Sequence, residues 1–318
     1  MAFHVLIAGG GVAGLEAAFA LRDLAGDRVR CTVLAREREF VSRPMAVAEP
    51  FARGLAQRVS LERICADAGA ELVAGKLARV DDPQRTAHVD DGTEIAYDAL
   101  LVAIGAGSEP AFPRGLTWTP DSDAEVFGGL LRDVEEGYVK QIGFVVPTGV
   151  AWPLPAYELA LMTAWEADSM GQRDVEVTVY THESAPLQAF GPAASAALRE
   201  DLDEIGVRVE TDAVVHATER RFIVEPGGRA LPGRIVSLPR AVGRPVAGLP
   251  SDVRGFIPVD AQGKVFGTAH VWAAGDAIVF PIKQGGLAAQ QAVAAAEEIA
   301  ARAGADVRPS PFRPVLRG

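Results

Sequence analysis

The chain has 318 residues, about twice the length of a typical domain, which predicts two domains or one large one. Hydrophobic residues make up 49% and charged residues 23%, a composition that is typical of globular proteins and excludes a disordered chain. The 31 Lys and Arg against 42 Asp and Glu give a net charge of −11. Such a charge repels phosphate backbones and anionic headgroups, so no nucleic-acid partner is expected.

The cysteines, the histidines and the apolar start of the chain exclude further classes. Cys31 and Cys65 are too few for a disulfide scaffold or a structural zinc site, which favours a reducing, cytoplasmic compartment. The five histidines are scattered without ligand spacing, so no metal site is expected. No basic region precedes the first apolar run, and Glu16 and a glycine cluster interrupt it. We therefore expect neither a signal peptide nor a transmembrane segment.

The first predicted elements form a βαβ unit. Phe3–Ala8 is an almost wholly apolar run, typical of a strand buried on both faces of a parallel sheet. Apolar periodicity predicts a helix over about Val12–Leu24, and a second strand follows at Val29–Ala35. Further along we expect a helix at Leu61–Ala68, alternating strand and turn residues over Glu71–Val89, a hairpin turn at Asp91-Gly92 and a buried strand at Leu100–Ile104.

A second, similar pattern follows and predicts an internal duplication. It comprises strands at Ile142–Val146 and Val175–Tyr180, helices at Leu154–Met170 and Pro192–Ile205, and strand and hairpin residues over Val207–Leu238. A strand at His270–Ala274 and a helix at about Gly286–Arg302 close the chain. The sequence therefore predicts an α/β fold of two Rossmann-like dinucleotide-binding domains, the second inserted into the first. We expect residues 1–110 and 251–318 to form the first domain and residues 111–250 the second.

The strongest local motif is the glycine-rich turn between the first strand and the first helix. It fits the pattern G-x-G-x-x-G, whose glycines permit a tight turn, close approach of a pyrophosphate and close packing of helix on strand. The unpaired N–H groups at the helix start and the helix dipole would hold the phosphates. The residues predicted to bind a dinucleotide here are Gly9, Gly11, Val12, Ala13 and Gly14.

The acid that would bind the adenosine ribose is displaced from its usual place. At the end of the second strand the expected position holds Ala35, and the nearest acid, Glu37, comes two residues later. Glu37 is either a ribose ligand or a solvated loop charge. On the following loop, Arg43 and Pro44 are candidates for contact with the adenine or a phosphate, the alternative being an ordinary surface arginine.

Two further motifs carry a resemblance to a known family. They are Ala103-Ile104-Gly105 at the end of a predicted strand and Gly275-Asp276 late in the chain. With the glycine-rich turn, they make the sequence resemble the FAD-dependent pyridine nucleotide-disulfide oxidoreductase superfamily, within which it looks most like the type II NADH dehydrogenase and sulfide:quinone oxidoreductase branch. The resemblance implies a bound FAD, contacts from Ala103 and Gly105, and an Asp276 carboxylate that bonds the ribityl chain.

The residues after Asp276 are expected to lie beside the isoalloxazine ring. The resemblance places Lys283, Gln284 and Gly285 at the start of the last helix, whose positive end would stabilise negative charge on reduced flavin. Lys283 would add a full charge or bond the ring, unless it is a solvated loop lysine. Glu158 matches a family glutamate facing the flavin and is either a proton relay or an ordinary helix acid. Lys283 and Glu158 are therefore the catalytic candidates.

The sequence also departs from the family pattern in three places. The second-domain loop between Thr148 and Glu158 has one glycine, carries Pro153 and Pro155 where N–H donors are wanted, and places Trp152 in the path of a pyrophosphate. NAD(P)H is therefore expected to bind in an altered way or not at all. The cysteines lie outside the family's redox positions. The family's C-terminal domain is absent or truncated, so a partner or a missing domain would cover the flavin.

These observations predict an FAD-dependent oxidoreductase that passes electrons through a non-covalent flavin to a quinone or another small-molecule acceptor, without redox cysteines. One alternative is an NAD(P)H dehydrogenase with an atypical nicotinamide site. The other is a non-catalytic flavin-binding subunit of a complex.

Overall fold

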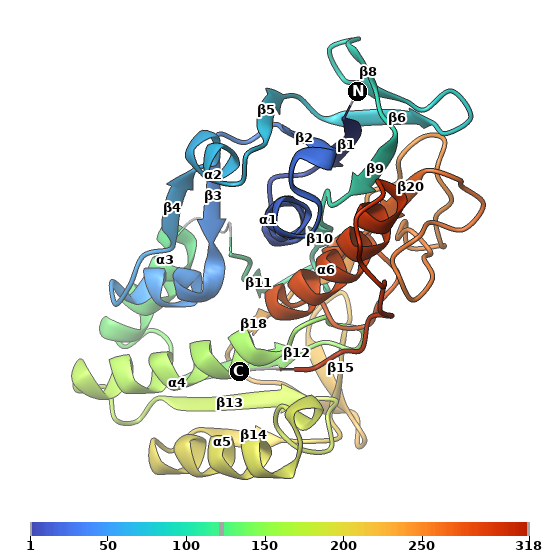
Figure 1. Cartoon of the computed structure of the whole chain (residues 1–318). Coiled ribbons are helices and arrows are strands. Elements are labelled where there is room, and N and C mark those ends of the chain that lie inside the picture. Colours follow the sequence, from blue (N-terminus) through green and yellow to red (C-terminus); the bar gives the residue numbers. More distant parts are fainter. Residues whose placement is uncertain (1, 121–123, 317–318) are drawn as a thin grey trace. The chain divides into compact units, whose positions relative to one another are not determined.

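The computed structural model describes residues 2–120 and 124–316, and these form two compact units. Unit 1 comprises residues 1–41, 58–107 and 242–318, and unit 2 comprises residues 42–57 and 108–241. Each unit is built on a five-stranded parallel sheet, and the chain leaves unit 1 twice to form unit 2 (Figure 1). The predicted α/β fold with two Rossmann-like domains is confirmed. Across the described residues, no helix combines the length and apolar character needed to cross a membrane.

The sheet of unit 1 has the strand order expected of a dinucleotide-binding fold. The first strand pairs in parallel with the second on one side and with a later strand on the other, so the strand order reverses beside it. The order across the sheet is β20 (Val271–Ala273), β9 (Ala99–Val102), β1 (Phe3–Ala8), β2 (Val29–Ala35) and β5 (Glu71–Ala74).

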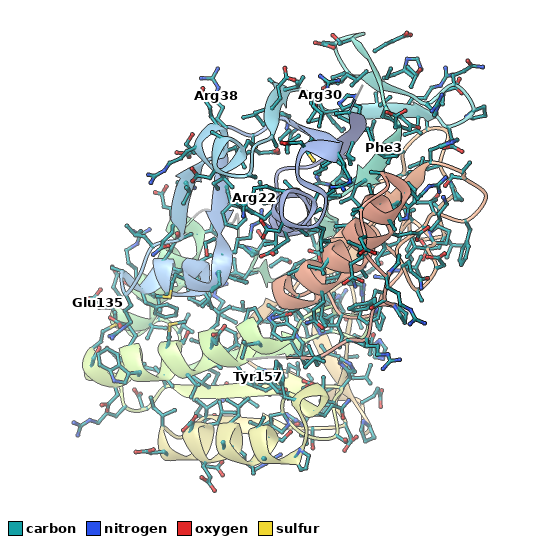
Figure 2. The ribbon with its side chains drawn as sticks, viewed as in Figure 1. Phe3, Arg22, Arg30, Arg38, Glu135 and Tyr157 are labelled. Atoms are coloured by element: carbon teal, nitrogen blue, oxygen red, sulfur yellow. The ribbon has the colours of Figure 1, made fainter. Side chains whose placement is uncertain are left out.

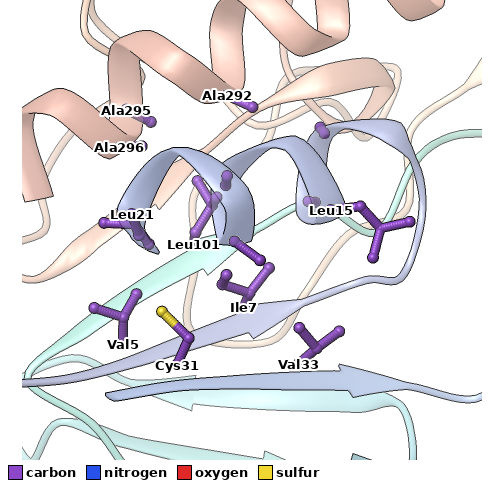
Figure 3. Close-up of a cluster of buried hydrophobic side chains, with 14 of the residues drawn as sticks. Val5, Ile7, Leu15, Leu21, Cys31, Val33, Leu101, Ala292, Ala295 and Ala296 are labelled. Carbon is purple, nitrogen blue, oxygen red and sulfur yellow. The ribbon is translucent and has the colours of Figure 1, made fainter. Parts of the chain in front are cut away.

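Alternating side chains of these strands fill two cores. Val5 and Ile7 of β1 point into one core and Leu6 and Ala8 into the other, so the strand is buried on both faces as its apolar run predicts. The first core is covered by α1 (Val12–Ala25), α2 (Leu61–Asp67) and α6 (Gly285–Arg302). Figure 3 shows α1 over the strands, with three alanines of α6 facing it, Ala292, Ala295 and Ala296. These small side chains allow the two helices to approach closely.

The second core is covered by short strands and connections. A three-stranded antiparallel sheet consists of β6 (Leu77–Asp81), β7 (Thr86–Val89) and β8 (Glu94–Ala96). The predicted turn at Asp91-Gly92 joins the last two, and Gly92 has a φ of +91°. Two further sheets have two strands each, β3 (Glu39–Ser42) with β4 (Gln57–Ser60) and β10 (Gly107–Glu109) with β19 (Arg240–Val242). The 3₁₀ turns of unit 1 are η1 (Gly26–Arg28) and η4 (Gly275–Ala277).

Unit 2 repeats the same topology around its own core. Its parallel sheet has the order β11 (Leu116–Thr117), β18 (Arg234–Ser237), β12 (Gln141–Val146), β13 (Glu176–Thr181) and β14 (Arg208–Glu210). Helices α4 (Leu154–Ser169) and α5 (Pro192–Glu204) lie on opposite sides of β13 (Figure 1). The remaining elements are α3 (Ala124–Glu135), η2 (Arg43–Phe51), η3 (Gln188–Phe190) and the antiparallel strands β15 (Val214–Ala217), β16 (Phe222–Glu225) and β17 (Arg229–Ala230).

Candidate functional site

The glycine-rich turn connects β1 to α1, and at two of its glycines the backbone lies very close to a carbonyl oxygen. Gly9 has a φ of +123°, and a Cβ atom there would lie 2.2 Å from the carbonyl oxygen of Ala103. A Cβ atom on Gly14 would lie 2.0 Å from the carbonyl oxygen of Gly9. The fold itself therefore requires glycine at these two positions.

Gly11 differs from its neighbours because its Cα faces open space. A Cβ atom there would have no heavy atom within 4 Å, and its φ of −87° is accessible to any residue. Gly11 is the N-cap of α1, and no side chain among the described residues caps this helix. The N–H groups of the first turn of α1, those of Val12 and Ala13 among them, have no carbonyl partner within the helix. Such a helix start is the kind of element that binds phosphate groups.

The strand end opposite this turn supplies Ala103 and Gly105. Ala103 is buried, and its N–H donates to the carbonyl of Ala8 at 2.7 Å, which ties the ends of β9 and β1 together. Gly105 has a φ of +68° with open space at its Cβ position. The two strand ends flank the point where the strand order reverses, the usual ligand crevice of an open α/β sheet.

The Gly275-Asp276 turn packs directly on the start of α1. Gly275 has a φ of +74°, and a Cβ atom there would lie 2.9 Å from the Cβ of Ala13. Its buried N–H donates to Oε1 of Gln291 at 2.9 Å. Asp276 follows and is half-buried. Gln291 was not predicted as a site residue, because only the fold brings a residue from the second turn of α6 to the Gly275-Asp276 turn.

The start of α6 also converges on the start of α1. A Cβ atom on Gly285 would lie 3.9 Å from Cγ2 of Val12. Gln284 is the N-cap of α6, and its own Oε1 accepts the N–H of Leu287 at 2.9 Å. Two helix N-termini and the Gly275-Asp276 turn therefore meet at the carboxyl edge of the unit 1 sheet.

Lys283 is held within this group by two contacts. Its Nζ donates to the carbonyl oxygen of Ile278 at 2.5 Å and lies 4.1 Å from the ring centroid of Phe256. Burial lowers the pKa of Lys283 to about 8, with Arg254 acting in the same direction and Asp276 and Asp252 opposing it. The side chain is half-buried, and its amine contacts the Ile278 carbonyl and the Phe256 ring.

Glu37 lies at the surface. Its side chain is exposed and pairs with Arg36 at 3.2 Å. Two positions earlier, Ala35 is buried, and its Cβ lies 3.1 Å from the place a Cβ of Gly10 would take.

The other predicted site residues belong to unit 2. Arg43 and Pro44 begin η2, and Glu158 lies in the second turn of α4. Glu158 is half-buried, and burial raises its pKa. It has no hydrogen bond or ion pair with any residue that the structure describes.

The loop between β12 and α4 is closed by other side chains of unit 2. Arg240 follows β18 and donates from Nε to the carbonyl of Thr148 at 3.3 Å and from Nη1 to that of Ala111 at 2.9 Å. Trp152 packs edge-on against Phe190, with ring centroids 5.4 Å apart. Gly149, with a φ of +77°, is the one glycine of the loop.

A buried carboxylate at the end of β13 was not predicted from the sequence. Glu183 is 4% exposed and accepts the hydroxyl of Tyr157 at 2.7 Å and that of Thr181 at 3.0 Å. Tyr157, labelled in Figure 2, is fully buried on α4. The carboxylate that follows β13 is therefore bonded inside unit 2.

The cysteines and histidines form no further site in the described part of the chain. Cys31 lies within β2 and Cys65 within α2, both buried, and burial raises the pKa of Cys31 to about 11. Over residues 2–120 and 124–316, no group of three or more His, Cys, Asp or Glu is placed to hold a metal ion.

Comparisons with known proteins agree with this geometry. A curated relative, the sulfide-quinone reductase of Aquifex aeolicus, is 28% identical over 214 residues, which cover 64% of this chain and 49% of the relative, so the match spans about half the relative's length. The solved sulfide:quinone oxidoreductase of the same organism superposes with a TM-score of 0.81 at 23% identity, covering 94% of this chain and 76% of that one. A ferredoxin reductase from Rhodopseudomonas palustris gives 0.70 at 23% identity, covering 98% and 78%.

A family profile covers most of the chain in two segments. The profile described as pyridine nucleotide-disulphide oxidoreductase matches residues 3–143 and 156–298. The break between the segments, residues 144–155, contains the atypical loop between β12 and α4. The matched segments include the glycine-rich turn, Ala103-Ile104-Gly105, Gly275-Asp276 and Lys283. The chain therefore belongs to the pyridine nucleotide-disulphide oxidoreductase family of flavin-dependent enzymes.

Proposed function

We propose that unit 1 binds FAD non-covalently and that the chain passes electrons to a quinone or another small-molecule acceptor without using its cysteines. The observation that carries the proposal is the open space at Gly11, where the N-termini of α1 and α6 and the Gly275-Asp276 turn converge. A quinone is the proposed acceptor because the curated relative is named a sulfide-quinone reductase. Bound FAD would supply the redox chemistry, and the protein would supply position and electrostatics.

The residues of unit 1 have distinct roles in this proposal. The N–H groups of Val12 and Ala13 would bind the pyrophosphate, and Gly11 leaves room for it. The Asp276 carboxylate would accept a hydrogen bond from a ribityl hydroxyl. Lys283 and the positive end of α6 would stabilise negative charge on the ring system. Ala103 and Gly105 would form the floor of the crevice.

The remaining candidate residues have lesser roles. Glu37, Arg43 and Pro44 are proposed contacts of the adenosine half. Glu158 is the proposed proton relay, since its raised pKa keeps the carboxyl protonated over a wider pH range. Cys31 and Cys65 are buried and take no part.

Gly11→Val tests where the cofactor binds. A valine side chain would enter the open space and exclude the pyrophosphate, while its Cβ would have no heavy atom within 4 Å. We expect the purified protein to be yellow, or to become yellow with FAD, and the variant to stay colourless with an unchanged far-UV spectrum. Gly128→Val is the matched control, because Gly128 in α3 also faces open space. A Gly11→Val variant that retains full flavin would refute the site.

Anaerobic titration tests the reaction. We expect sulfide or another small reductant to bleach the flavin and a quinone analogue to restore it. NADH and NADPH should act weakly, with dissociation constants nearer millimolar than micromolar, a deficit of about 4 kcal/mol. Saturable bleaching at micromolar NADH would instead show an NAD(P)H dehydrogenase. Bleaching by dithionite alone would show a non-catalytic flavin-binding subunit.

A further inference from the structure

We propose that Phe256 is a positioning residue whose ring face holds the Lys283 ammonium against the carbonyl of Ile278. The two contacts of the ammonium group are a hydrogen bond of 2.5 Å to that carbonyl and a separation of 4.1 Å from the ring centroid. Attraction between a cation and the negative face of an aromatic ring is strongest where water is excluded. The consequence for flavin chemistry rests on the proposed function, but the positioning does not.

The ring and the carbonyl are fixed in the same piece of local structure. Phe256 is 4% exposed, and its N–H donates to Oδ1 of Asp252 at 2.8 Å. The next residue, Ile257, donates to the carbonyl of Ala277 and accepts from the N–H of Val279, both at 2.9 Å. These bonds clamp the segment that carries the ring alongside the segment that carries the Ile278 carbonyl. Contacts within unit 1 therefore set the position of the Lys283 amine.

The charges around Lys283 both oppose and favour its ammonium form. Burial opposes the ammonium form most strongly, and Arg254, which lies 5.4 Å from the same ring, opposes it as well. Asp276 and Asp252 favour it. In this balance the ring face is a further source of stabilisation for the cation, and it also sets the direction in which the amine points.

Removal of the ring face should lower the proton affinity of Lys283. Phe256→Leu keeps an apolar side chain at the site but removes the aromatic face, so we expect the pKa of Lys283 to fall by about one, a tenfold change in proton affinity. Phe256→Tyr retains an aromatic face and should restore most of the wild-type value. Ile257→Val is the packing control, because it loosens the same buried segment and leaves the ring in place.

The measurement is direct because the chain contains only four lysines. The full-length protein, labelled with ¹³C-lysine, is titrated by NMR without FAD, and Lys283→Arg assigns the signal. In the wild type the Lys283 side-chain protons should be shifted by the ring current of Phe256, a result that depends on no variant. Absence of that shift, or equal pKa values in the wild type and Phe256→Leu, would overturn the proposal. An equal fall in Phe256→Leu and Ile257→Val would overturn it too, since packing alone would then explain the change.

The same variants with FAD separate this inference from the proposed function. If Lys283 contacts the flavin, the pH at which the flavin midpoint potential changes slope should follow the pKa of Lys283 from variant to variant. A pKa that falls as expected while the potential profile stays constant would refute the flavin contact of Lys283. It would leave its positioning by Phe256 established.

Discussion

The strongest single test of the Gly275-Asp276 turn is the substitution Gln291→Met. Methionine matches glutamine in length and helix propensity but offers no oxygen to the N–H of Gly275. That N–H is buried and bonds Oε1 of Gln291 at 2.9 Å, so the substitution leaves a buried donor without its acceptor. The cost of such a group is about 1–3 kcal/mol. If FAD requires the turn in its present form, the same energy appears as a roughly five- to 150-fold rise in Kd.

The assay is a fluorescence titration of flavin-free protein with FAD, combined with urea unfolding. Gln290→Met is the matched control, because Gln290 is the neighbouring residue on the same helix and makes its bonds, to Gly286 and Val315, at the surface. We expect the control to change the Kd less than threefold. Equal effects of the two substitutions, or a Gln291→Met protein that is destabilised but binds FAD normally, would refute the argument that Gln291 fixes the turn for the cofactor.

Three further outcomes are expected. Asp276→Ala should weaken FAD binding by about 1.5–3 kcal/mol, measured as Kd, whereas Glu37→Ala should have a smaller effect, because Glu37 is exposed and paired with its neighbour. Tyr157→Phe should lower the free energy of unfolding of unit 2 by about 1.5–3 kcal/mol in urea, because the buried Glu183 carboxylate loses a 2.7 Å hydrogen bond. Cys31, with a pKa raised to about 11, stays a thiol until the pH approaches that value, so it should react with a disulfide reagent in native protein far more slowly than in urea at pH 8. Rapid labelling of the native protein would show that this strand opens.

The elements that were predicted correctly carry their signal within a few consecutive residues. The apolar run Phe3–Ala8 and the glycine-rich turn after it indicated the strand and the helix start, because sterics at Gly9 and Gly14 act between neighbours in the βαβ unit. Helix α4 was predicted within one residue of its observed end. Helix α3 was missed although Phe127 and Leu130 follow helical spacing and are buried.

Residues that act across long sequence distances were not predicted. Gln291 reaches Gly275 across sixteen positions, and Glu183 reaches Tyr157 across twenty-six. Glutamine in a helix and glutamate after a strand are common surface residues, so nothing in the local pattern marks them as buried. The segment η2 contains Pro44 and Pro50, which argue against a helix in sequence, and the structure forms it as 3₁₀ turns.

The two units share one topology but differ in the residues at the edge where a nucleotide is expected to bind. In each, the strand order reverses beside the first strand of the βαβ pattern, at β1 in unit 1 and at β12 in unit 2. In unit 1 the facing strand end is Ala103, whose backbone meets Gly9 and leaves the space at Gly11 open. The close approach of these two strand ends is therefore made by backbone atoms.

In unit 2 the facing strand end leads to Arg240, and its guanidinium donates to Thr148 in the loop that should receive the pyrophosphate. If Arg240 bound a phosphate at that loop, its guanidinium would lose its hydrogen bonds to the carbonyls of Thr148 and Ala111. The Glu183 carboxylate, the nearest acid for the ribose of a bound NADH, already accepts hydrogen bonds from Tyr157 and Thr181. The two bonds of Glu183 are buried and the bond from Arg240 to Ala111 is partly buried, so the loss of each costs about 1 kcal/mol or more. Several such losses together approach the deficit of about 4 kcal/mol that separates millimolar from micromolar binding of NADH. We therefore propose that the side chains that follow the strands, rather than the sheet that carries them, decide which unit binds a dinucleotide.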